Sequence, residues 1–102
     1  RPFLNPGEDR RPTLTFPRHI PLDEEPSDTF IEINKNAEFH KNSNIPKLFI
    51  NADPGFLLVG SQRDEVREWN NLKEVTVKGN HFIQEDSPDE ITVHIKDFIN
   101  DL

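Results

Sequence analysis

The sequence predicts an α/β domain in which two parallel strands are flanked by helices. Helical and strand-like patterns alternate from residue 27 onward, in the order helix, strand, helix, strand, helix. The length of 102 residues suits one domain. A strand, a helix and a strand in succession usually form a βαβ unit with a right-handed crossover, so we expect the two strands to be parallel neighbours.

The first quarter of the chain is rich in proline. Six of the nine prolines stand at positions 2, 6, 12, 17, 21 and 26, and proline disrupts both helix interiors and central strands. This segment is therefore predicted to be an irregular arm with no long helix. Its apolar residues, which include Leu14, Phe16 and Ile20, indicate that the arm lies against another surface.

The first helix and the first strand follow the arm. Ser27 or Asp28 can cap a helix that ends near residues 42–44. Behind Pro46, the apolar run at residues 48–50 is typical of a short strand buried on both faces of a parallel sheet.

The second half of the unit repeats this order. A polar helix is expected at residues 61–69, with Val66 and Trp69 on one face. Residues 72–77 alternate between apolar and polar side chains, which predicts the second strand.

The last helix is the most strongly marked element. The sequence SPDE at residues 87–90 forms a potential capping box with proline at the first helical position. Apolar residues then recur at helical spacing, at Ile91, Ile95, Phe98, Ile99 and Leu102. We expect this stripe to pack on the sheet and His94 to lie on the polar face.

Composition excludes several classes of function. With 19 acidic and 12 basic residues, the net charge is -7, which disfavours nucleic acid and anionic membranes as partners. The sequence has no cysteine and no apolar run long enough to cross a bilayer, so thiol chemistry and membrane insertion are not expected. We expect a cytoplasmic protein.

A two-stranded sheet is unstable alone, so each strand requires neighbours that these residues do not supply. The sequence also begins without methionine. The chain is therefore interpreted as a fragment, a processed product or a subunit.

His81 is the principal candidate for chemistry. It follows the second strand, and the carboxyl ends of parallel strands face the crevice where ligands bind in open α/β sheets. Imidazole can act as a base near neutral pH, although a turn histidine without a chemical role fits the same position. Asp53, after the first strand, is similarly either an acid or an ordinary turn residue. The four histidines lack ligand spacing, so no metal site is expected.

Three segments resemble the haloalkane dehalogenases of the α/β-hydrolase fold. They are RRPTLTFPRHIP at residues 10–21, IPKLFINADPG at residues 45–55 and HFIQEDSPDEI at residues 81–91. The resemblance covers nearly the whole chain but only the C-terminal part of the family. It implies that residues 1–44 are the end of a helical cap and a return helix, and that residues 45–102 are the last strands and helices of the core.

The resemblance also implies an activity, the hydrolysis of carbon–halogen bonds in haloalkanes to alcohol and halide. In that family an aspartate displaces halide to form an alkyl-enzyme ester, tryptophan with asparagine or a second tryptophan binds the halide, and a histidine assisted by an acid hydrolyses the ester. Only His81 matches these residues, as the base. The nucleophile is then supplied by a missing N-terminal portion or a complementary chain, the isolated chain is inactive, and no cofactor is involved.

The same resemblance implies an apolar substrate pocket. Five residues match pocket positions: Phe16, Pro17, Ile20, Phe56 and Leu57. An apolar lining suits an uncharged halocarbon, although plain core packing explains each residue equally well. Phe16 stands where this motif usually has tryptophan.

Two alternatives stay open. The sequence DPGF at residues 53–56 also resembles the Renilla-type luciferases, which share the fold and oxidise coelenterazine. A third interpretation is a non-catalytic interaction module whose exposed strand edges pair with a partner.

Overall fold

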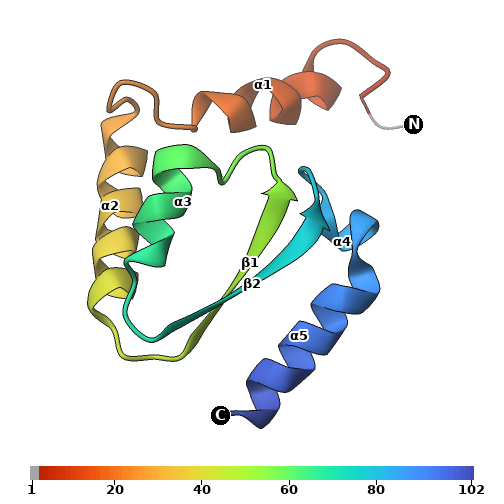
Figure 1. Cartoon of the computed structure of the whole chain (residues 1–102). Helices are drawn as coiled ribbons and strands as arrows, with labels where there is room; N and C mark the ends of the chain where they lie inside the picture. The colour runs from red at the N-terminus through yellow and green to blue at the C-terminus, as the bar shows by residue number, and fades with distance from the viewer. Residues whose placement is uncertain (1–2) are drawn as a thin grey trace. The chain divides into compact units, whose positions relative to one another are not determined.

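A computed structural model describes residues 3–102. The elements in chain order are η1 (Glu8–Arg10), α1 (Arg11–Arg18), α2 (Ser27–Asn42), β1 (Lys47–Pro54), α3 (Gly60–Arg67), β2 (Leu72–Gly79), α4 (Ile83–Asp86) and α5 (Pro88–Asn100) (Figure 1). They fall into two compact units that divide between Phe39 and His40. In the described part of the chain, no helix has the length and apolar character that a bilayer crossing requires.

The proline-rich arm is not irregular throughout, because it contains the eight-residue helix α1. Pro12 lies in the first turn of α1, where backbone N–H groups make no intrahelical hydrogen bond, so its lack of an N–H costs nothing. Pro17 lies in the last turn. The hydroxyl of Thr13 donates to the carbonyl of Arg10 at 2.6 Å. Proline thus limits the length of the helix without preventing it.

The helix α2 begins at Ser27 and ends at Asn42, as the sequence predicts. At its start the N–H of Thr29 donates to Asp28 Oδ1 at 2.8 Å. Phe30 and Ala37 are half-buried, whereas Ile33 is exposed.

The strands β1 and β2 are hydrogen-bonded and parallel, in register from Lys47 opposite Leu72 to Pro54 opposite Gly79. The α/β class and the parallel pairing are therefore confirmed. Both strands extend beyond their predicted ends, because the ladder continues until the N–H of Gly55 donates to the carbonyl of Gly79 at 3.0 Å. Both strands consequently end at one edge of the sheet.

Helices cover the two faces of this strand pair. Neighbouring residues of β2 point to opposite faces: Glu74 pairs with Arg67 of α3, and Lys73 pairs with Asp101 after α5. Figure 1 shows α3 and α5 on opposite sides of the strands accordingly. The described apolar core is small, with Phe49 and Val77 as its buried members.

The packed face of α5 differs from the predicted stripe. Ile91, His94 and Phe98 are half-buried, while Ile95 and Ile99 are exposed. The expectation that His94 lies on a solvated face is therefore wrong. Two strands cover only one side of the stripe, so the helix buries the side nearest them.

Candidate active site

His81 lies at the carboxyl edge of the sheet, between the end of β2 at Gly79 and the start of α4. The loop after β1 reaches the same edge through the hydrogen bond from the Gly55 N–H to the Gly79 carbonyl, 3.0 Å long. The two loops that carry the predicted site residues are therefore neighbours. This follows from the parallel register, which ends both strands together.

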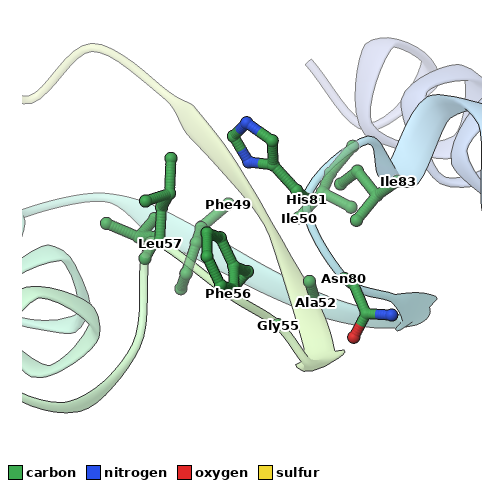
Figure 2. Close-up of a pocket in the computed structure, with 10 residues that line it drawn as sticks. Phe49, Ile50, Ala52, Gly55, Phe56, Leu57, Asn80, His81 and Ile83 are labelled. Atoms are coloured by element: carbon green, nitrogen blue, oxygen red, sulfur yellow. The ribbon is translucent and has the colours of Figure 1, made fainter. Parts of the chain in front are cut away.

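The imidazole of His81 contacts two phenyl rings. Its centroid lies 5.8 Å from that of Phe56, with an interplanar angle of 63°, and 4.4 Å from that of Phe82, at 54°. His81 is itself exposed to solvent. In Figure 2 the imidazole and the amide of Asn80 point in opposite directions from the turn. The imidazole thus contacts aromatic rings on one part of its surface and is open to solvent on the rest.

These residues border a cavity of about 200 Å³. Its lining, shown in Figure 2, consists of Phe49, Ile50, Ala52, Gly55, Phe56, Leu57, Leu58, Asn80, His81 and Ile83. The lining is mainly apolar, and the polar side chains are those of Asn80 and His81. Such a cavity suits an uncharged ligand with one polar or reactive centre.

The structure brings together three of the residues named from the sequence, His81, Phe56 and Leu57. Sequence reasoning missed Ile50 and Ile83, which line the same cavity. The signal for Ile50 was its place in the first strand, but the one-turn helix α4 that presents Ile83 has no periodic pattern that a sequence could reveal.

The other three named residues belong to the N-terminal unit. Phe16 and Pro17 lie in the last turn of α1, and Ile20 lies just after it. The side chains of Phe16 and Ile20 are exposed. Their contribution to a substrate pocket stays a prediction.

Two side chains at the end of α4 hold the turn that carries His81. The N–H of Asn80 donates to Asp86 Oδ2 at 3.1 Å, and the hydroxyl of Ser87 donates to the carbonyl of Lys78 at 2.6 Å. Ser87 is buried, with 8% of its surface exposed.

This use of Ser87 overturns the predicted capping box, because its side chain makes no capping hydrogen bond to α5. The hydroxyl instead satisfies a carbonyl at the end of β2. The motif therefore joins the last helix to the turn of His81.

Among residues 3–102, no hydrogen bond or ion pair joins a carboxylate to the imidazole of His81. Asp53, considered above as an acid, is exposed at the end of β1. Across the same described range, no group of three histidine, cysteine, aspartate or glutamate side chains is arranged to hold a metal ion.

The parallel strand pair joined by a helix, with a histidine beyond the second strand and a helix behind it, matches the C-terminal end of an α/β-hydrolase core, as its structural neighbours show. The haloalkane dehalogenase of Mycolicibacterium smegmatis is 52% identical over 104 residues, which cover 100% of this chain and 33% of that protein. The dehalogenase of Sphingobium indicum is 52% identical over 101 residues, covering 99% of this chain and 34% of its own length. The chain is a homologue of the haloalkane dehalogenases and corresponds to their C-terminal part.

Solved structures agree with the sequence relatives. The ancestral haloalkane dehalogenase AncHLD2 superposes with a TM-score of 0.84 and 33% identity, covering 98% of this chain and 35% of that one. The dehalogenase DatA of Agrobacterium tumefaciens C58 gives 0.77 and 29%, covering 90% of this chain and 32% of its own. No protein-family model matches the chain.

A relative with another activity is also similar. The coelenterazine h 2-monooxygenase of Renilla reniformis is 42% identical over 100 residues, covering 96% of this chain and 32% of that protein. In every one of these comparisons the chain spans about a third of its relative's length.

Proposed function

We propose that this chain forms the C-terminal part of a haloalkane dehalogenase and that His81 is the base in its second half-reaction. The observation that carries the proposal is the position of His81 at the carboxyl edge of the sheet, against Phe56 and beside a mainly apolar cavity. The 52% identity to two named dehalogenases supports the same reaction.

In this reaction an aspartate carboxylate displaces halide from the haloalkane and forms an alkyl ester. Water then attacks the ester carbonyl and gives its proton to the imidazole of His81. The alcohol leaves, taking up a proton, and the aspartate carboxylate re-forms. Histidine is the side chain used most often for such a step, and the exposure of His81 leaves its ring open to water.

The substrate is proposed to be an uncharged haloalkane. Phe56 and Leu57 line the cavity beside His81 and offer it no charge. Phe16, Pro17 and Ile20 are proposed as further lining from the cap. Apolar side chains favour a halocarbon over a charged compound, because a charge would lose its hydration there.

The nucleophile, the acid and the halide-binding residues are proposed to come from polypeptide outside these 102 residues, in the same chain or a complementary one. Two buried polar atoms, Asn51 Oδ1 and Trp69 Nε1, have no hydrogen-bond partner within residues 3–102, which supports further polypeptide packed against them. Leaving such an atom unpaired costs about 1–3 kcal/mol. We accordingly expect the isolated chain to be inactive.

The test is reconstitution. The chain is mixed with a complementary dehalogenase segment that carries the nucleophilic aspartate, and halide release from a terminal haloalkane is measured. We expect release from the mixture and none from either part. His81→Phe should stop turnover and leave an alkyl adduct on the aspartate, visible as added mass, whereas His94→Phe on α5 should still turn over.

Continued turnover by His81→Phe would show that the assigned base is wrong. Binding of the complement without any product would favour the non-catalytic interaction module instead.

A luciferase is the second candidate, favoured by the 42% identity to the Renilla monooxygenase. The mainly apolar lining beside His81, which includes the ring of Phe56, also suits an aromatic group of a substrate. Coelenterazine is therefore assayed in parallel with the haloalkane. Light emission without halide release would replace the dehalogenase proposal.

A further inference from the structure

Arg63 of α3 is bound to the loop that carries two cavity residues. Its Nη2 donates to the carbonyls of Ala52 at 3.2 Å and Pro54 at 3.3 Å, and its Nε donates to the carbonyl of Leu58 at 3.3 Å. One guanidinium thus joins the beginning and the end of the loop. Arginine suits this task because its donors are held in a rigid planar fork that stays charged at any physiological pH.

The loop backbone lies directly against this guanidinium. Gly55 has a φ of +77°, and a Cβ there would lie 3.1 Å from Arg63 Nη2 and 2.9 Å from the carbonyl oxygen of Ala52. The N–H of Gly55 meanwhile donates to Gly79, two residues before His81. Hydrogen bonds therefore connect Arg63, through the loop, to the end of β2 just before the histidine.

Among residues 3–102, packing alone does not hold the side chains of this loop. Phe56 is 67% exposed and Leu57 is 59% exposed. Their positions depend on the loop backbone, and Arg63 is the side chain that binds that backbone at three carbonyls.

We infer that Arg63 is a positioning residue for the cavity: it fixes the loop at residues 53–58 and so holds Phe56 against the imidazole of His81. The effect of Arg63 on substrate binding rests on the proposed function. Its effect on the position of Phe56 does not. Without the guanidinium, the loop loses three charge-assisted hydrogen bonds, and Phe56 loses its fixed place beside His81.

The chain offers a matched control one turn further along α3. Arg67 forms an ion pair with Glu74 of β2 at 2.8 Å and lies 3.7 Å from Asp64. It makes no hydrogen bond to the loop among the described residues. Arg63→Gln and Arg67→Gln remove the same charge from the same helix, but only the first affects the loop.

The first measurement is NMR of the whole chain. In the unaltered protein and in Arg67→Gln, we expect cross-relaxation between the ring protons of Phe56 and His81. In Arg63→Gln that signal should be lost, and the His81 ring shifts should move toward those of Phe56→Ala. Retention of the Phe56–His81 signal in Arg63→Gln would overturn the inference.

Arg63→Lys gives a second route, used also if Arg63→Gln does not fold. A single ammonium can reach one or two of the three carbonyls, so the Phe56–His81 signal should be weakened but present. A Phe56–His81 signal of full strength in Arg63→Lys would show that the planar guanidinium is unnecessary and would overturn its assigned role.

The second measurement uses the reconstituted enzyme. Because Phe56 lines the cavity without touching the transferred proton, Arg63→Gln should raise KM for the haloalkane by roughly five- to tenfold and change kcat less than twofold. Arg67→Gln should change neither beyond about twofold. An unchanged KM in Arg63→Gln overturns the catalytic part of the inference, whereas absence of halide release by the unaltered protein refutes the proposed function and leaves the NMR result to decide on Arg63.

Discussion

The ring of His81 meets the ring of Phe56 edge to face, with centroids 5.8 Å apart and planes inclined at 63°. The two residues are 25 positions apart in the sequence. They meet because β1 and β2 end at the same edge of the sheet, with Gly55 hydrogen-bonded to Gly79. The exposed imidazole therefore has an apolar neighbour that restricts where its ring can lie.

Replacing Phe56 should therefore weaken substrate binding more than it lowers the stability of the fold. Phe56→Ala removes one wall of the cavity and an aromatic contact of the kind worth about 0.5–1.5 kcal/mol. We expect KM of the reconstituted enzyme to rise roughly three- to tenfold, with little change in the unfolding midpoint. Phe56→Tyr keeps the ring and serves as control. An unchanged KM in Phe56→Ala would remove Phe56 from the proposed pocket.

The turn of His81 should depend on Asp86 and not on its neighbour Glu85. Asp86→Ala leaves the N–H of Asn80 without its carboxylate partner, which should cost about 1 kcal/mol of stability and accelerate hydrogen exchange at Asn80. The side chain of Glu85 makes no hydrogen bond or ion pair with any described residue, so Glu85→Ala should change stability by less than about 0.5 kcal/mol. Equal effects of the two substitutions would contradict this role for Asp86.

The strand order and the helix positions could be predicted because they depend on local patterns. Alternating residues around Val75 and Val77 predicted β2, and Ser27 or Asp28 predicted the start of α2; both elements lie where expected. The contact of Phe56 with His81 was not among these predictions; the structure shows it, and it results from the parallel pairing.

The hydrogen bonds that hold the site could not be predicted in the same way. Arg63 and Ser87 donate to backbone carbonyls of other elements, and any residue type supplies such a carbonyl. The sequence around Ser87 indicated a capping box, which is the commonest use of that pattern. The hydroxyl of Ser87 donates to the carbonyl of Lys78 instead, because the chain folds back on β2 at that point.

The backbone at Gly55 should tolerate no side chain. Gly55→Ala places a methyl group 2.9 Å from the carbonyl oxygen of Ala52 at a φ of +77°, so we expect a loss of about 1–3 kcal/mol in the free energy of unfolding, measured in urea. Gly60→Ala is the matched control, since Gly60 also has a positive φ, of +55°, but has open space around it. Gly60→Ala should lower the free energy of unfolding only by the cost of a left-handed backbone for a residue with a Cβ, about 1–2 kcal/mol. A larger loss at Gly60 than at Gly55 would rule out the close approach as the cause.

The ion pair between Arg67 and Glu74 should make stability depend on pH in the acid range. The hydrogen bond from the Arg67 guanidinium, aided by its charge, holds the pKa of the Glu74 carboxyl below its ordinary value of 4.5. A carboxyl whose pKa is lower in the folded state than in the unfolded chain adds stability above the unfolded value, and that stability is lost as pH falls through the folded value. Glu74→Gln should therefore be less stable than the unaltered chain at pH 7, and the difference should shrink below about pH 4.5. Urea unfolding at pH 7 and pH 3 measures it, with Glu85→Gln as the control that shows no such difference. If the free energies of unfolding of Glu74→Gln and the unaltered chain differ by the same amount at both pH values, the ionised pair contributes nothing.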